Sequence, residues 1–394
     1  MAPFVWFKGL IMNFELTEEQ AMIQDAAKQF AEGVLAPKAA ELDLTSDPKI
    51  LESHLKQLAE QGFMGVNIAG EYGGTEAGTI AFSLAITELA RACASTAVAV
   101  SVSNMVAELI QEIGSDAQKN YYLPKLCSGE FAAGSFCLTE TEAGSDPAAM
   151  KTRAVKEGDA WVLNGSKVWI STAALAGVYV VWAVTNPDAP KGKGISCFLV
   201  DGDNPGITVA KPENKMGQKG SGTHEVIFED CRIPLDAIIG EENQGFKIAV
   251  TELCGGRIGI ASLALGVAKA ALDYARDYVK ERKQFGKPLA EFQGLQWMLV
   301  DNYTEMEAAR LLTMQAAALK DAGKPFAVQA SMAKLMATEK GNKACYDALQ
   351  LLGANGYMQD FPLERYARDI RVTSIYEGTS EIQKVIIARS LFSN

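Results

Sequence analysis

The residue with the clearest chemical potential is a carboxylate, Glu377, which stands immediately before Gly378 near the end of the chain. Ser380 followed three residues later by Gln383 predicts a capping box that opens an amphipathic final helix, so Glu377 falls on the loop before that helix. The apolar Ile-Tyr pair that precedes Glu377 would raise the pKa of its carboxyl group and make it a stronger base once a ligand excludes water. The alternative is an ordinary solvated loop glutamate.

Two segments carry side chains that suit a large flat cofactor. Residues 136–147 run from an apolar strand into a turn of small residues, where backbone N–H groups and the hydroxyls of Thr139 and Ser145 could hold a polar ring edge. Residues 167–172 place the Trp169 indole and two hydroxyls at the end of a strand, which suits stacking and hydrogen bonding to a ring system. Taken singly, each segment is equally consistent with a strand that ends in a turn.

Two later segments suit the polar part of such a cofactor. Gly286 has the features of a helix C-terminal stop, which predicts that Arg282 and Phe285 lie one turn apart on the same helix face. A guanidinium and a ring so placed could hydrogen-bond to a pyrophosphate and stack on a nucleotide base. Residues 350–356 predict a helix that ends in small residues, which would let a ligand approach closely, although a simple C-cap explains them as well.

The sequence lacks the residue patterns of several other kinds of catalytic and binding site. The chain has two histidines, no nucleotide-binding glycine motif and no G-x-S-x-G elbow, and its seven cysteines are scattered, so neither a hydrolase triad nor a zinc site nor a disulfide framework is indicated. A net charge of -11 argues against nucleic acid and anionic membrane surfaces as partners. We therefore expect a protein of the reducing cytoplasm without a bound metal.

Periodicity predicts the elements that position these residues. Apolar residues at helical spacing fill the chain to about Gly134, short strands follow, and long helices return after Gly245. The prediction is a mainly α protein with a β-barrel or sandwich in the middle and an antiparallel helical bundle at the end. The predicted parts are an extension outside the fold at 1–11, an N-terminal helical domain at 12–134, a β domain at 135–245 and a C-terminal bundle at 246–394.

These motifs, in this order and spacing, resemble the acyl-CoA dehydrogenase family, and most closely its short-chain (butyryl-CoA) branch, from Met12 to the end of the chain. The resemblance implies a helical domain, a middle β domain and a C-terminal four-helix bundle, assembled as a homotetramer, a dimer of dimers, with FAD. It also implies that Glu377 is the catalytic base.

The resemblance further assigns binding roles to individual residues. Those expected to bind FAD within one subunit are Phe136, Leu138, Thr139, Gly144, Ser145, Trp169, Ile170, Ser171, Thr379 and Glu381. Those expected to hold the FAD of a neighbouring subunit are Arg282, Phe285, Gln293, Gln350, Gly353 and Ala354. Those expected to contact the acyl-CoA are Ser145, Cys254, Arg257 and Gly378.

The implied reaction is α,β-dehydrogenation of a short- to medium-chain acyl-CoA to the trans-2-enoyl-CoA, as in fatty acid β-oxidation. Glu377 would remove the α-proton, flavin N5 would accept the β-hydride, and an electron-transfer flavoprotein would receive the electrons. An enoyl-CoA reductase that runs the reaction backwards would need the same residues. A non-catalytic flavin or acyl-CoA binding protein, an acyl-CoA oxidase and a cofactor-free bundle are further alternatives.

Two positions depart from the short-chain pattern. Thr141-Glu142 stands where the branch usually has a proline-containing pair, which adds a carboxylate near the expected flavin turn. Cys254 stands where the branch mostly has Asp, so a hydrogen bond to the CoA portion would be weakened. We expect either weaker binding or a shifted thioester, or else a cysteine that simply packs as a small apolar residue.

Overall fold

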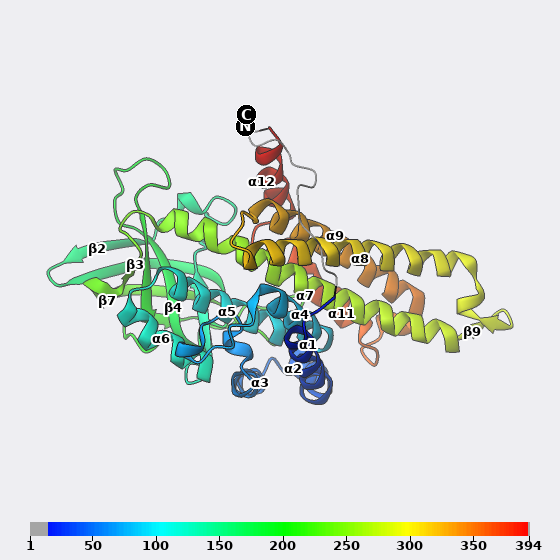
Figure 1. The fold of residues 1–394 in the computed structure, drawn as a ribbon. Coiled ribbons are helices and arrows are strands. Elements are labelled where there is room, and N and C mark those ends of the chain that lie inside the picture. The colour runs from blue at the N-terminus through cyan, green and yellow to red at the C-terminus, as the bar shows by residue number, and fades with distance from the viewer. Residues whose placement is uncertain (1–14, 393–394) are drawn as a thin grey trace.

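The computed structural model describes residues 15–392, and the predicted extension at residues 1–11 lies outside them. Helices come first along the chain, strands follow, and helices return (Figure 1). The sheet lies at one end of the molecule in this view, and the long helices run towards the opposite end. This order confirms the predicted fold class, a mainly helical protein with a β domain in the middle.

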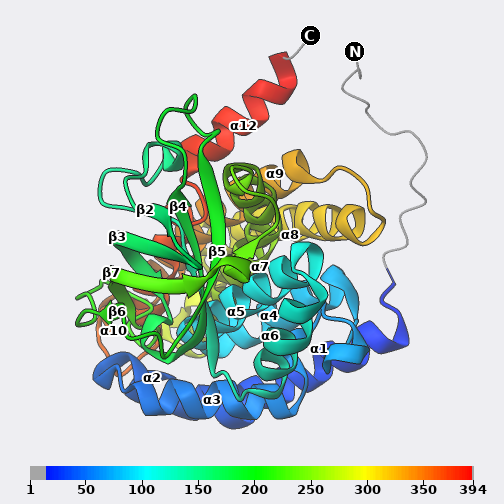
Figure 2. The same cartoon turned by 90° about the vertical axis from the view of Figure 1, so that its left-hand side faces the viewer.

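Helices alone make up the first part of the described chain. They are α1 (Glu18–Phe30), α2 (Ala36–Thr45), α3 (Pro48–Glu60), α4 (Gly78–Ala92), α5 (Ala94–Ile113) and α6 (Asp116–Ser128). Thr17 caps α1, since its hydroxyl accepts the Gln20 N–H at 3.2 Å and the Gln20 side chain accepts the Thr17 N–H at 3.1 Å. Figure 2 shows α2 and α3 along the base of the molecule, with α4, α5 and α6 above them.

The strands of the middle region belong to one sheet. They are β1 (Ala133–Cys137), β2 (Arg153–Glu157), β3 (Ala160–Ser171), β4 (Ala176–Val184), β5 (Ile195–Asp201), β6 (Ile207–Val209), β7 (Thr223–Pro234) and β8 (Ile238–Ile239). Their order is β6-β7-β3-β2-β4-β5-β8, with β1 paired in parallel to β4. The predicted domain limits at 134 and 245 stay predictions; the structure changes from helix to strand between Ser128 and Ala133 and back between Ile239 and Gly245.

Strand β4 shows why the sheet has a core on each face. Successive strand side chains point to opposite faces. Val180 and Trp182 pack in one core with residues of α5 and α6, whereas Tyr179 and Val181 pack in a second core with residues of β3, β5 and β7. Because both faces are covered, β4 is a continuous apolar run without polar alternation.

Asn-Gly pairs are typical of turns between two strands, but Asn164-Gly165 is a bulge within the single long strand β3. Gly165 has φ +147°, and a Cβ there would meet Thr152 side-chain and backbone atoms at 2.6–2.8 Å. Glycine is needed because the neighbouring chain approaches so closely. The bulge keeps residues 160–171 in one element, and this element carries Trp169 and Ser171 at its end.

Long helices return after the sheet. The remaining elements are α7 (Gly245–Glu281), β9 (Lys283–Gln284), β10 (Lys287–Pro288), α8 (Gln293–Asp321), α9 (Ala327–Leu352), α10 (Ala354–Tyr357), α11 (Leu363–Arg371) and α12 (Ser380–Phe392). Helix α7 is long and apolar enough to span a membrane, but most of its apolar stretch is buried inside the protein. Alanines along α7, α8 and α9 share one core with α1–α5, so the N-terminal helices and the bundle pack as one body.

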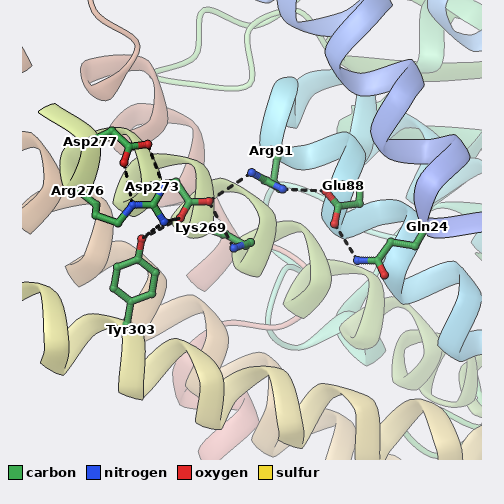
Figure 3. A network of polar contacts seen from close by, with 8 residues as sticks. All are labelled: Gln24, Glu88, Arg91, Lys269, Asp273, Arg276, Asp277 and Tyr303. Atoms are coloured by element: carbon green, nitrogen blue, oxygen red, sulfur yellow. Dashed lines mark hydrogen bonds and ion pairs between the residues drawn. The ribbon is translucent and has the colours of Figure 1, made fainter. Parts of the chain in front are cut away.

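A polar network on the surface of this shared core joins the N-terminal helices to the bundle (Figure 3). Arg91 of α4 pairs with Glu88 at 3.1 Å and with Asp273 of α7 at 3.3 Å. Gln24 of α1 donates to Glu88 at 2.9 Å, and the Tyr303 hydroxyl of α8 donates to Asp273 at 2.8 Å. Polar contacts therefore join four helices from the two ends of the chain, α1, α4, α7 and α8.

Candidate active site

Glu377 lies on a strained loop between α11 and α12. Its φ is +55°, and that of Gly378 is +88°, so two successive residues adopt the left-handed conformation. The sequence points to Gly378 as the unusual backbone position, whereas the structure adds Glu377, for which this conformation is uncommon. Strain of this kind persists only where the surroundings over-determine the conformation, and it concentrates at functional sites.

The carbonyl groups of this loop are held from two helices. The Lys334 ammonium of α9 donates to the Gly378 carbonyl at 2.8 Å. The Gln383 side chain donates to the same carbonyl at 2.8 Å and to the Glu377 carbonyl at 3.2 Å. Lys334 and Gln383 are fully buried. Together these bonds hold the backbone of the loop in its strained conformation. The sequence alone gave no indication of this role for Lys334.

The predicted capping box at Ser380 is wrong by one residue. Thr379 precedes α12, and its hydroxyl accepts the Ile382 N–H at 3.3 Å, so Thr379 is the N-cap. Ser380 is the first helical residue and donates to the Glu339 side chain of α9. The shift arises because the Gln383 amide bonds to the loop carbonyls rather than to the capping residue.

The Glu377 carboxyl group is buried among charges of opposite sign. Its Oε2 atom is buried and has no hydrogen-bond partner in the described chain. Burial raises its pKa to about 7, and the positive charges of Arg257 and Lys334 oppose that rise. Burial also lowers the pKa of Lys334 to about 8, opposed by Glu377. The carboxylate can therefore gain and lose a proton near neutral pH.

The apolar surroundings of Glu377 come from other elements than the sequence suggested. Ile375 is half exposed, and the Tyr376 hydroxyl accepts a hydrogen bond from Gln218 of the β domain at 3.2 Å. The burial comes from α5 and α7 instead: a Cβ at Gly256 would meet both Oε2 of Glu377 and Sδ of Met105 at 2.8 Å. A small residue at position 256 is what allows the carboxylate to fit against α7.

The two β-domain segments predicted to hold the cofactor lie side by side. The Val168 N–H donates to the Thr139 carbonyl at 3.0 Å, which places residues 136–139 next to 168–171. Trp169 has φ +59° and is 57% exposed, although it is a large apolar side chain. The hydroxyls of Thr139, Ser145 and Ser171 have no hydrogen-bond partner among residues 15–392. An exposed indole beside open hydroxyls fits one edge of a flat polar ring.

The other residues of these two segments take different positions. Leu138 and Ile170 are buried in the two cores, so their side chains support the segments from behind. Phe136 packs on Trp182 with ring centroids 4.3 Å apart. Gly144 and Ser145 are exposed on the turn after β1. At the start of α12, Thr379 is half-buried and Glu381 is exposed, next to Glu377 in the chain.

The remaining predicted cofactor residues lie at the other end of the protein. The hairpin that contains Arg282 and Phe285 projects from the far tip of the bundle, away from the sheet (Figure 1). The residues exposed in this end region are Arg282, Phe285, Gln293, Gln350, Gly353 and Ala354. The Asn355 amide donates to the Tyr278 hydroxyl at 2.9 Å, which ties the end of α9 to the end of α7. Within one chain the structure therefore does not bring them to the β-domain segments.

The prediction that Arg282 and Phe285 lie on one helix face before a stop at Gly286 is wrong. Helix α7 ends at Glu281, and residues 283–288 form a two-stranded hairpin. Phe285 and Gly286 occupy its tip with φ +53° and +79°, the conformation of a type I′ turn. Phe285 is consequently 93% exposed, with one ring contact to Phe292.

The two departures from the family pattern have different environments. Glu142 is 72% exposed and pairs with Lys151, so its carboxylate is a solvated surface charge. Cys254 is buried on α7, where its Sγ donates to the Val250 carbonyl at 3.3 Å and accepts from the Arg257 guanidinium at 3.5 Å. Among residues 15–392 this is the one hydrogen bond of the Arg257 side chain, which is only 4% exposed. Cys254 therefore touches Arg257 and packs as a small residue.

Two cavities among residues 15–392 bear on the choice of site. One, of about 370 Å³, lies between residues 148–153 and 184–195 of the β domain, and none of the predicted site residues lines it. Its lysines at 151 and 191 already pair with Glu142 and Asp146. The other, of only about 10 Å³, borders Gly256 and hence the base.

Comparison with protein families gives three consecutive matches that cover most of the chain. The acyl-CoA dehydrogenase N-terminal domain matches residues 17–130, the middle domain residues 135–231 and the C-terminal domain residues 243–392. Among curated relatives, the acryloyl-CoA reductase (NADH) of Anaerotignum propionicum is 45% identical over 96% of either chain. The short-chain specific acyl-CoA dehydrogenase of Clostridium acetobutylicum is 43% identical over 97% of this chain and 100% of its own.

Solved structures agree with these matches. Butyryl-CoA dehydrogenase from Megasphaera elsdenii superposes with a TM-score of 0.93 at 38% identity, over 96% of this chain and 100% of that one. A chain from work on the electron transferring flavoprotein of Acidaminococcus fermentans gives a TM-score of 0.94 at 41% identity, over 97% and 100%. A glutaryl-CoA dehydrogenase from Mycobacterium smegmatis in complex with FADH2 gives 0.90 at 30% identity, over 96% of each chain.

Proposed function

Because the chain belongs to the acyl-CoA dehydrogenase family, we propose that it is an FAD-dependent enzyme that converts a short-chain acyl-CoA to the trans-2-enoyl-CoA. The observation that supports this most directly is Glu377, a carboxylate whose Oε2 is buried without a partner between two cations. A glutamate with a purely structural role would use its buried oxygen in a hydrogen bond. This one is free to receive a proton from a ligand.

The chain's own residues account for the acid–base part of the reaction. Glu377 takes the α-proton of the thioester, and the charges of Arg257 and Lys334 favour its ionised form beforehand. The Glu377 N–H has no partner in the described chain, so it can donate to the thioester carbonyl and acidify the α-carbon. Lys334 and Gln383 hold the loop in the orientation that presents both groups.

The β-domain edge fits FAD, because an exposed indole at Trp169 and the open hydroxyls of Thr139, Ser145 and Ser171 lie on adjacent segments. When bound, FAD supplies the flavin N5 that accepts the β-hydride. Ser171 would hydrogen-bond the ring near this atom and Trp169 would cover it. Ser145 and Gly378 would contact the acyl-CoA.

A homotetramer is proposed from the position of Arg282 and its neighbours. They lie far from the β-domain edge in one protomer, so they can serve FAD only from a neighbouring subunit. Large apolar side chains are exposed nearby on α8, on α9 and at the end of α10, as expected for a subunit interface: Trp297, Val300, Tyr346, Tyr357 and the α10 C-cap Met358. We also propose a cytoplasmic enzyme of β-oxidation whose electrons pass to an electron-transfer flavoprotein.

Anaerobic titration of the purified flavoprotein with butyryl-CoA and longer acyl-CoAs tests the proposal. Bleaching of the oxidised flavin band together with formation of the enoyl-CoA is expected. A protein that stays yellow with every acyl-CoA, or that holds no FAD, would contradict it.

A second candidate, enoyl-CoA reduction, is favoured by the similarity to an acryloyl-CoA reductase. Reoxidation of the reduced enzyme by acryloyl-CoA or crotonyl-CoA, compared with that by the flavoprotein acceptor, separates the two directions.

The rate of flavin reduction is expected to depend on the protonation of Glu377. Its pKa is raised to about 7, mainly by burial, and only the deprotonated form accepts the α-proton. The rate constant should therefore rise with pH, reach half its maximum near pH 7 in the free enzyme, and level off above that. Stopped-flow reduction by butyryl-CoA from pH 5.5 to 8.5 measures it. A rate that falls with pH over this range would exclude Glu377 as the base.

Cys254→Asp is expected to move the midpoint of that pH profile upwards. The new carboxylate would lie beside the Arg257 guanidinium, where Sγ now accepts at 3.5 Å, and would partly neutralise the charge that favours ionised Glu377. Cys254→Ser, which adds no charge, is the control and should leave the midpoint near 7. Tighter acyl-CoA binding with an unchanged midpoint would instead support direct contact between residue 254 and the CoA portion.

A further inference from the structure

The β6–β7 loop, residues 210–222, packs against helix α11. A Cβ at Gly217 would lie 2.2 Å from the Arg368 carbonyl oxygen and 2.6 Å from the Asp369 N atom, so the two backbones are in direct contact. The next residue, Gln218, donates its backbone N–H to the Asp369 carboxylate. This loop of the β domain is therefore fixed to the helix that leads into the base.

The side chain of Gln218 continues to the residue before the base. Its amide donates to the Asp369 carbonyl at 3.0 Å and to the Tyr376 hydroxyl at 3.2 Å. Gln218 is only 3% exposed and has φ +48°, an uncommon conformation for a residue other than glycine. Such strain persists only where the surroundings over-determine it, as these bonds do, and it concentrates at functional sites. Gln218 therefore has the features of a residue whose position matters to the site.

The β6–β7 loop is braced internally, so it can transmit a position. The Lys215 ammonium donates to the Gln218 carbonyl at 2.9 Å, to the Ser221 carbonyl, and to the Thr223 hydroxyl at 2.9 Å. The Glu213 N–H donates to the Thr223 carbonyl at 2.8 Å, which closes the loop at its base. One ammonium group thus ties the residue that reaches α11 to the start of strand β7.

The other end of the loop is joined to the strand end that we expect to hold the flavin. Thr223 pairs with Ser171 in the β3–β7 ladder. The Thr172 N–H donates to the Gly222 carbonyl at 3.0 Å. Gln218 and Thr223 are only five positions apart in the chain. A short, braced segment therefore connects the expected flavin contact at Ser171 to the residue before the base.

The proposed reaction requires a base at the α-carbon and a flavin at the β-carbon of the same thioester. We propose that the β6–β7 loop sets the position of Glu377 relative to the flavin, with Gln218 as a positioning residue that acts through Tyr376. The inference rests on the proposed function. Lys334 and Gln383 hold the loop carbonyls on the C-terminal side of the base. Gln218 holds the residue on its N-terminal side, so the base is anchored from both directions.

The first test is Gln218→Met, which removes the amide but keeps an unbranched side chain of similar length. In the holoenzyme, the rate constant of flavin reduction at saturating butyryl-CoA should fall about ten- to a hundred-fold, because a misplacement of about 1 Å can cost that much. The Kd for butyryl-CoA and the FAD content should stay within about two-fold of the original values. Anaerobic stopped-flow reduction over a range of butyryl-CoA concentrations gives the rate constant and the Kd separately.

Gln118→Met is the matched control. Gln118 is also buried, at 8% exposed, and its amide also joins a helix to the β domain, since it donates to the Asp236 carbonyl at 2.8 Å and the Ile238 carbonyl at 3.0 Å. Both variants should lower the temperature of the thermal transition, because each leaves buried carbonyl groups without a donor. Only Gln218→Met should slow flavin reduction. An equal loss of rate in Gln118→Met would contradict a positioning role for Gln218.

Tyr376→Phe tests the route by which Gln218 acts, and it replaces Gln218→Met should that variant not fold. It removes only the hydroxyl that accepts the Gln218 amide, so it should slow reduction to a similar extent. The double variant should be no slower than the slower single variant, because both changes break the same contact. A crystal structure of either variant should show the Glu377 carboxyl group displaced. Losses that multiply in the double variant would overturn the inference.

The outcomes separate this inference from the function on which it rests. If the unaltered protein and Gln218→Met reduce their flavin at the same rate with butyryl-CoA, only the inference is wrong. A weaker Kd with an unchanged rate constant also contradicts it, because it would make Gln218 a residue of binding rather than of positioning. If no acyl-CoA reduces the flavin of the unaltered protein, the proposed function itself fails.

Discussion

Glu377→Gln is expected to lower the rate of flavin reduction by acyl-CoA about 10²- to 10⁴-fold or more while FAD stays bound. Glutamine has nearly the shape of glutamate but cannot take up the α-proton. The loop should keep its conformation, because Lys334 and Gln383 bond to its backbone carbonyls rather than to the side chain. Single-turnover reduction followed at the flavin band measures the effect, and the ratio of flavin to protein absorbance confirms that cofactor is retained.

Exchange of the α-proton of butyryl-CoA with deuterated solvent should disappear in the same variant. Glu142→Gln is the control: Glu142 is an exposed carboxylate paired with Lys151, and its loss should leave reduction unchanged. If Glu377→Gln reduced its flavin at close to the original rate, another carboxylate would have to be the base. Glu252 would then be the candidate, since it is a buried glutamate beside Gly256 and, unlike the neighbouring Glu108, it is not paired with Lys320.

Arg282→Ala is expected to release FAD, with an affinity loss of about ten- to a hundred-fold, the typical value of a lost hydrogen bond to a charged group. Arg282 makes no side-chain hydrogen bond or ion pair with the described residues of its own chain, so its removal should not weaken the protomer fold. Equilibrium dialysis of FAD and sedimentation of the holoenzyme measure binding and assembly. Lys283→Ala, at the next position of the same hairpin, is the matched control.

The thermal transition of the variant freed of cofactor should match that of the parent protein treated in the same way. A holoenzyme that is monomeric yet binds FAD tightly would contradict the proposed sharing of cofactor between subunits. Retention of FAD by Arg282→Ala in an intact tetramer would show that the far tip of the bundle has another role.

Much of the architecture follows from local pattern. The strands are recognisable because β-branched and aromatic residues cluster between turn residues, and the capping box at Thr17 needs only residues within one turn of each other. Local pattern misleads where two local structures compete. Residues 282–286 continue a helical sequence, yet Phe285 and Gly286 both take positive φ, and the chain turns back as a hairpin. Asn164-Gly165 has the composition of a turn but lies within a strand because Thr152 packs against it.

By itself, the sequence was enough to place Glu377 on a loop before the last helix and to pair Trp169 with a strand end, since both depend on residues close in the chain. Only the tertiary structure decided what surrounds the carboxylate. Lys334, Arg257 and Met105 come from three other helices and lie between 43 and 272 positions away in the chain. Burial and Coulomb interactions depend on distance in space and not along the chain, so the groups that bury Glu377 and oppose the rise of its pKa could not be predicted from local residue types.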